Sequence, residues 1–169
     1  VTCILNKLKH FLPEHILKII YNSLISCHLN YGLLVWGNKA HHLLKNQKKA
    51  VRIITKSKYN AHSDPLFKKL SILKIQDMKT LNEMKFYYKF LKGLLPNYFQ
   101  NEYIVFKQDF HQYNTRHRSY ISTPRIHFEL SKSTLRYQLT STVNECPNHI
   151  KSKLHTHYLK GFPNYSKNY

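Results

Sequence analysis

Apolar residues recur at helical spacing over residues 13–31, and this pattern constrains the fold more than any other feature of the chain. Pro13 suits the first position of a helix, and Glu14 complements the positive end of the helix. The apolar face then comprises Leu17, Ile20 or Tyr21, Leu24, Cys27 and Tyr31. Gly32 is a suitable stop. The pattern predicts an amphipathic helix whose inner face is buried against other helices.

A second helix is expected from about His41 to Thr55. Its inward residues would be Leu43, Leu44, Gln47, Val51 and Ile54. Between the two helices, residues 33–36 fit either a short extended piece or a last helical turn, and Gly37-Asn38 predicts a turn. Trp36 in this link is expected to seal the core of the bundle rather than to stack on a ligand.

Two further helical stretches come next. Asp64 as N-cap and Pro65 at the first helical position predict a helix of one to two turns. A long helix is expected over residues 77–94, ended by Pro96, with Met78, Leu81, Met84, Tyr88, Leu91 and Leu95 inward. The short links between these helices predict a mainly α fold, with a compact three-to-four-helix bundle as a first domain over residues 1–96.

The rest of the chain, residues 97–169, is expected to form a distal segment of different character. Residues 97–131 are rich in Tyr, Asn, Ser and Thr and show no sustained period. They predict an irregular segment that crosses the surface of the bundle. A short terminal helix is expected over residues 147–159.

The net charge indicates the class of partner. Lysine and arginine number 27 against 8 aspartates and glutamates, a formal net charge of +19. An excess of this size favours a polyanion, first of all nucleic acid. A bias of the coding sequence toward A and T, which would also supply the abundant Asn, Ile and Tyr, is an alternative source of the charge.

Cysteine usage and hydropathy bear on the compartment. Cys3, Cys27 and Cys146 are far apart and odd in number, which argues against a disulfide framework and fits a reducing compartment, the nucleus or the cytoplasm. The uncharged run over residues 19–38 contains too many polar residues for a membrane span. We therefore expect an intracellular protein with no membrane partner.

The basic side of the second helix is the first candidate for a binding surface. It carries Lys45, Lys48, Lys49, Arg52 and Lys56 at steps of three and four residues. Like charges at these steps repel by a few tenths of a kcal/mol per pair. Since Glu14 is the only acidic residue before Asp64, we expect this array to face phosphates. The alternative is an ordinary solvated helix face.

A second candidate lies in the distal segment. Its residues are Tyr113, Asn114, Arg116, His117 and Arg118. An aromatic residue among basic residues suits stacking and phosphate contact on a single strand of nucleic acid. The alternative is a loop that Asn and Arg hydrogen bonds tie to the bundle.

No metal or catalytic centre is expected. Cys146, His149, His155 and His157 do not match a recurrent zinc-site spacing. Polymerases hold two metal ions on closely spaced carboxylates, whereas Asp64, Asp77 and Asp109 are isolated and no two acidic residues are adjacent. We therefore expect no catalytic residue and no cofactor in this chain.

Four sequence motifs occur in order. They are IIYNSLISCHLNYGLLVWG at residues 19–37, QKKAVRIIT at residues 47–55, HSDPLFKKLSILKIQD at residues 62–77 and YNTRH at residues 113–117. Together they resemble the region that comes after the catalytic palm in reverse transcriptases of non-LTR retrotransposons, the jockey-like and CR1-like elements. The Asp-Asp turn of that palm is absent here.

The resemblance implies a helical thumb and the distal region beyond it. Such a region grips the RNA/DNA primer–template for a palm encoded upstream in the same polypeptide, and the divalent metal would belong to that palm. Lys45, Lys48, Lys49 and Arg52 would then lie toward the nucleic-acid backbone. Two alternatives remain open: a stand-alone basic module that binds RNA or DNA, and an inert transposon remnant.

Overall fold

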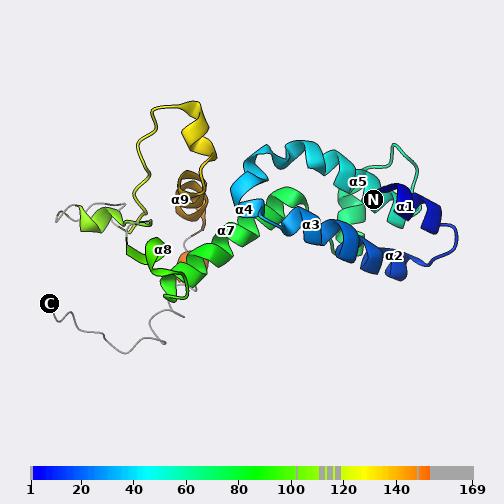
Figure 1. The fold of residues 1–169 in the computed structure, drawn as a ribbon, viewed down its shortest axis with the longest axis horizontal. Coiled ribbons are helices and arrows are strands. Elements are labelled where there is room, and N and C mark those ends of the chain that lie inside the picture. Colours follow the sequence, from blue (N-terminus) through cyan, green and yellow to red (C-terminus); the bar gives the residue numbers. More distant parts are fainter. Residues whose placement is uncertain are drawn as a thin grey trace. The chain divides into compact units, whose positions relative to one another are not determined.

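The computed structural model describes residues 2–101, 103–110, 113, 116, 119–147 and 149–152. This part of the chain is mainly α-helical, as expected, and its only strand-like pairing is an isolated antiparallel bridge between Phe106 and Ile121 (Figure 1). The chain divides into two compact units, residues 1–82 (unit 1) and residues 83–169 (unit 2). The division falls inside the helix α7, Ile75–Leu91, and not after residue 96, because this one helix supplies core residues to both units.

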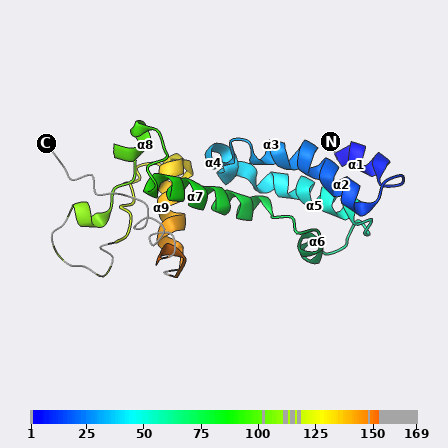
Figure 2. The ribbon, with the colours of Figure 1, turned by 90° about the horizontal axis from the view of Figure 1, so that it is seen from below.

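Unit 1 is a bundle of short helices. In chain order they are α1 (Thr2–Leu8), α2 (Glu14–Tyr21), a π-helical stretch η1 (Asn22–Ser26), α3 (Cys27–Asn30), α4 (Leu33–Trp36), a 3-10 stretch η2 (Gly37–His42), α5 (Leu43–Ile54), α6 (Ser63–Leu70) and the first part of α7. Helix α5 is the centre of the unit, since α1, α2 and α6 all pack against it. Figures 1 and 2 both show α2 and α3 running alongside α5.

The main core of unit 1 lies where these helices meet. Its buried residues are Leu5, Leu17, Tyr21, Ala50, Val51, Ile54, Phe67 and Leu70. Gln47 is fully buried among them and makes three hydrogen bonds. Its Nε2 donates to the hydroxyl of Tyr21 (3.0 Å) and to the carbonyl of Leu73 (2.8 Å), and its Oε1 accepts from the N–H of Ile75 (3.0 Å). Gln47, which the sequence predicted on the inner face of α5, therefore joins α2 to the link before α7.

The expected inner face of residues 13–31 is correct for its first half and wrong for its second. Leu17 and Tyr21 are fully buried, whereas Leu24 is 40% exposed, Cys27 is exposed and Tyr31 is 83% exposed. The π-helical stretch is the reason, because the N–H of Cys27 bonds to the carbonyl of Asn22, five residues back. A wider turn rotates the residues after it, so that Ile25 and Leu29 pack inward instead.

Residues 33–36 form the helical turn α4, which settles the alternative left open by the sequence. Gly32 precedes it in the left-handed conformation (φ 62°), where a Cβ would also come within 3.1 Å of the Trp36 ring. The indole N–H of Trp36 donates to the carbonyl of Tyr31 at 2.7 Å, and the ring packs on a second core cluster made of Leu33, Ala40 and Ile75. Trp36 is thus a packing residue in this unit.

The long helix and the short helix before it differ from expectation in detail. Helix α6 begins at Ser63 with His62 as N-cap residue, rather than at Pro65. Helix α7 spans Ile75–Leu91 rather than residues 77–94, and it ends before Pro96 because Gly93 turns the chain in the left-handed conformation. Leu81, expected inward, is 42% exposed, and the residues buried along α7 are Ile75, Glu83, Tyr87 and Leu91.

Unit 2 continues from α7 through α8 (Asn97–Asn101), the 3-10 turns η3 (Lys107–Asp109) and η4 (Glu129–Ser133), and α9 (Leu135–Glu145). Its core comprises Tyr87, Leu91, Ile104, Ile121, Leu139 and Val143. The side chain of Asn144 accepts from the N–H of Ile121 and donates to its carbonyl, both at 3.0 Å, and so holds the irregular segment against α9. Of the expected terminal helix, residues 149–152 are helical and Pro147 is not, and residues 148 and 153–159 lie outside the described residues.

Candidate nucleic-acid interface

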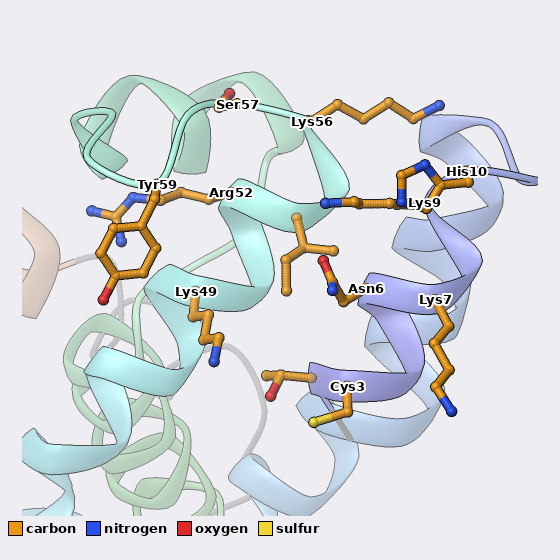
Figure 3. A pocket seen from close by; sticks show the side chains of 12 residues that line it. Cys3, Asn6, Lys7, Lys9, His10, Lys49, Arg52, Lys56, Ser57 and Tyr59 are labelled. Carbon is orange, nitrogen blue, oxygen red and sulfur yellow. The ribbon is translucent and has the colours of Figure 1, made fainter.

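A groove opens between α1 and α5 on unit 1. Its volume is about 640 Å³, and Figure 3 shows the side chains that line it. One wall comes from α1 and the residues just after it, and the other from the last turns of α5 and the loop after that helix. The lining residues are Thr2, Cys3, Asn6, Lys7, Lys9, His10, Lys49, Arg52, Ile53, Lys56, Ser57 and Tyr59. We call this feature the basic groove.

The basic groove gathers positive charge without carboxylates. Figure 3 shows Lys9 and His10 at one end and Arg52 and Tyr59 at the other, with Lys56 extending from the end of α5 toward α1. None of the described residues that line it is acidic. Cations brought together on a concave surface focus the field and attract an anion.

The carboxylates of residues 1–82 are Glu14, Asp64 and Asp77, and none of them lines the groove. Glu14 pairs with Lys69 at 2.7 Å. Asp64 pairs with Lys74 at 3.0 Å, and this hydrogen bond is the main reason that the pKa of Asp64 is lowered. Both ion pairs link residues outside the groove, so they leave its charge uncompensated.

The end of α5 places Lys56 in an uncommon conformation. The N–H of Ser57 bonds to the carbonyl of Arg52 (3.0 Å) and that of Lys56 to the carbonyl of Ile53 (3.2 Å), which together make a Schellman motif. The motif requires a left-handed residue, and Lys56 supplies it with φ 54°. Glycine is the usual residue there, and it does occupy the same place after α7, at Gly93. A lysine is therefore held at the groove at a cost in backbone strain.

The loop after α5 is also held in place. Arg52 donates from Nε to the carbonyl of Ala61 at 2.8 Å, and the N–H of Ala61 bonds to the carbonyl of Lys58 at 3.0 Å. Thr55 and Ser57 share a hydrogen bond of 2.8 Å between their hydroxyls. The aromatic side chain of Tyr59, carried by this loop, is nevertheless 85% exposed.

The structure separates the basic residues that the sequence grouped on α5. Lys49, Arg52 and Lys56 line the basic groove, whereas Lys45 and Lys48 do not. Lys48 lies close enough to Asp64 to contribute to the lowered pKa of that carboxyl group. Lys45 is exposed one helical turn before Lys49, beyond the end of the groove.

The second candidate group belongs to unit 2. Tyr113 is 81% exposed and Arg116 is exposed. His117, Arg118 and Asn114 lie outside the described residues. The structure therefore leaves the proposed role of this group as a prediction.

The basic and aromatic groove residues that were not predicted from the sequence are Lys7, Lys9, His10 and Tyr59. The available signal for the first three was the spacing of Leu5, Leu8 and Leu12, which indicates a helix before Pro13 with basic residues between its apolar ones. Leu5 is indeed fully buried. No local signal places these residues opposite Lys49, because that depends on the packing of α1 against α5.

The structure also bears on metal-ion sites and on membrane-spanning helices. Among the described residues, no group of three or more His, Cys, Asp or Glu side chains could hold a metal ion. Within the same part of the chain, no helix has the length and apolar character needed to cross a membrane.

Comparisons with protein-family models, with curated proteins and with solved structures found no match to this chain.

Proposed function

We propose that this chain binds nucleic acid through the basic groove, as the thumb and distal region of a non-LTR retrotransposon reverse transcriptase. The observation that carries the binding proposal is the groove itself, where Lys9, Lys49, Arg52 and Lys56 converge and no described lining residue is acidic. A phosphate backbone supplies the missing negative charge. Binding of this kind is largely independent of sequence, since phosphate contacts position a protein without reading bases.

The link to a reverse transcriptase rests on the sequence motifs. Three of them, at residues 19–37, 47–55 and 62–77, fall within unit 1. The second of these motifs, QKKAVRIIT, is the part of α5 that supplies Lys49, Arg52 and Ile53 to the groove. In this proposal the chain grips the RNA/DNA primer–template, and catalysis with its metal ions is the work of a palm in the same polypeptide.

A salt titration of binding tests the role of the groove. The full chain is titrated with an RNA/DNA hybrid over a range of salt concentrations, and the log of the affinity is plotted against the log of the salt concentration. The double variant Lys49→Ala/Lys56→Gly removes two groove cations. Its slope should be flatter by about 0.9 per lost phosphate contact. Its affinity at low salt should fall accordingly.

Lys45→Ala/Lys48→Ala is the matched control. It removes the same amount of charge, from α5 alone, and neither residue lines the groove. The proposal expects a much smaller change in slope for this variant. Equal slopes for the two double variants would mean that net charge alone drives binding, and would contradict the assignment to the groove.

A separate test addresses the full-length reverse transcriptase to which this chain would belong. The DNA upstream of the coding sequence should contain, in frame, a palm with its Asp-Asp turn. Joining that palm to this chain should increase primer extension over the palm alone, and the groove variant should reduce the gain. Extension that is equally efficient without the chain would contradict the thumb role, whether or not the groove binds nucleic acid.

A further inference from the structure

We propose that the basic groove takes a single strand of nucleic acid, with one base of that strand stacked on the ring of Tyr59. This inference rests on the proposed function, since it assumes that the groove binds phosphates. It adds two points: the ligand is a single strand, and Tyr59 contacts a base by stacking rather than by charge.

The size of the groove is the first argument. A volume of about 640 Å³ is typical of pockets that enclose drug-sized ligands, which range from roughly 300 to 1,000 Å³. It suits a short length of one strand and is too small to enclose a double helix. Of the two strands of a primer–template hybrid, only the one that faces the groove would reach its cations.

The combination of residues is the second argument. Proteins that bind single strands without sequence preference pair a positively charged groove with aromatic side chains on which bases stack. Among the described residues that line the groove, Tyr59 is the only Phe, Tyr or Trp. Its ring is 85% exposed, so a base can approach it. Ile53, between Lys49 and Lys56 in the sequence, adds an apolar surface to the same wall.

The fixed geometry of the loop is the third argument. The Schellman motif at Lys56 and the hydrogen bond from Arg52 to Ala61 hold both ends of the segment that carries Tyr59. A stacking residue on a fixed loop loses less conformational entropy on binding than one on a free loop. Exposure alone would not distinguish Tyr59, because Tyr31 is 83% exposed on the same unit, but Tyr31 does not line the groove.

The test compares Tyr59→Ala with Tyr59→Phe and uses Tyr31→Ala as the matched control. The probes are a short oligothymidylate, an abasic strand of the same length and an RNA/DNA hybrid, with the full chain in each case. Tyr59→Ala should weaken the oligothymidylate complex about tenfold, within the range measured for lost base–aromatic stacking. Tyr59→Phe keeps the ring and should bind as the parent protein does.

Three further results are expected. Tyr59→Ala should leave the salt slope unchanged, because no phosphate contact is lost. It should also leave binding of the abasic strand and of the hybrid unchanged, because neither offers an unstacked base. Tyr31→Ala should behave as the parent protein with every probe. Melting temperatures of all variants, measured alongside, show whether the fold is intact.

The outcomes separate this inference from the function on which it rests. Unchanged oligothymidylate binding in Tyr59→Ala, with a flatter slope in Lys49→Ala/Lys56→Gly, would overturn the stacking site and leave the phosphate groove standing. An equal loss for the oligothymidylate and the abasic strand would also overturn it. If the lysine variant binds as the parent protein does, the groove assignment itself fails.

Discussion

Arg52 donates a hydrogen bond from Nε to the carbonyl oxygen of Ala61 at 2.8 Å, and this contact closes the loop that carries Lys56 and Tyr59. Arg52 also lines the basic groove. Because the guanidinium has further N–H donors, one side chain can hold the loop and still offer hydrogen bonds to a phosphate. The residue thus connects the shape of the groove with its charge.

Replacing Arg52 by lysine should weaken binding although the charge is kept. A lysine ammonium cannot reproduce the fork of the guanidinium, so it loses either the Ala61 carbonyl or the phosphate. We expect a several-fold loss of affinity for an oligothymidylate, measured by titration at fixed salt. Lys49→Arg, the reverse exchange on the same wall, should bind at least as well as the parent. Equal affinities for Arg52→Lys and the parent would show that only charge matters at this position.

Lys56→Gly should stabilise the protein while weakening nucleic-acid binding. A non-glycine residue in the left-handed conformation costs about 1–2 kcal/mol, and the greater freedom of glycine in the unfolded chain offsets part of this. We expect a net gain of roughly 0.5–1 kcal/mol in the free energy of unfolding, measured by denaturant titration. The same variant loses a groove cation, so its affinity for the oligothymidylate should fall.

Ser71→Gly is the matched control for the opposite effects of Lys56→Gly on stability and on binding. Ser71 ends α6 in the same left-handed conformation (φ 52°) and does not line the groove. It should therefore gain a similar stability without any change in binding. A loss of stability in Lys56→Gly, or an equal effect of the two variants on binding, would contradict this explanation.

Gln47→Leu should destabilise unit 1 strongly. It would leave the hydroxyl of Tyr21, the carbonyl of Leu73 and the N–H of Ile75 without the partner that each now has. The Tyr21 hydroxyl and the Ile75 N–H are the buried ones of the three. A buried group that loses its hydrogen-bond partner costs about 1–3 kcal/mol, so a total loss of roughly 2–6 kcal/mol is expected. Thermal unfolding measures the effect. Gln76→Leu, the same exchange at an exposed position of α7, should change the melting temperature little.

The free energy of unfolding should fall at high pH because Tyr87 ionises. Burial raises the pKa of Tyr87 to about 12, and the charge of Cys146 contributes in the same direction. Because the folded pKa lies above the value of about 10 in an unfolded chain, the neutral hydroxyl favours the folded state. That contribution is complete below about pH 10 and is lost as the pH rises from about 10 to 12.

Tyr87→Phe has no group to ionise and should not show this loss. The difference in the free energy of unfolding between parent and variant should shift in favour of the variant by up to about 3 kcal/mol across this range of pH. Denaturant titrations at several pH values measure it. A difference that is constant with pH would mean that Tyr87 ionises as readily in the folded protein as in the unfolded one.

Residues on a single regular helix were predicted best. Helix α5 was expected over residues 41–55 and spans Leu43–Ile54, with Gln47, Val51 and Ile54 buried as predicted. Here the apolar spacing is regular, and one face meets the rest of the bundle. The inner face of α3 was not predicted, because the π-helical stretch shifts the register by a hydrogen-bond pattern that apolar spacing does not reveal. Helix α9 also escaped prediction, although Leu135, Leu139 and Val143 recur at steps of four residues.

The groove shows where prediction from sequence ends. The basic residues of α5 were identified, but Lys45 and Lys48 were grouped with Lys49 and Arg52 because all of them point away from the same core. The opposite wall comes from α1, which is brought there by burial of Leu5 against α5. Tyr59 joins the site through the turn at Lys56, whose left-handed conformation is not a property that lysine would suggest.

Protection of cysteine from alkylation tests most directly whether nucleic acid occupies the basic groove. Cys3 is exposed and lines the groove, whereas Cys27 is exposed elsewhere on unit 1 and serves as the internal control. The full chain is treated with a maleimide with and without a saturating oligothymidylate, and each cysteine is followed by mass spectrometry. We predict that the strand slows the modification of Cys3 and leaves that of Cys27 unchanged. Equal rates at Cys3 with and without the strand, under conditions where the strand is bound, would place the binding site elsewhere and contradict the account.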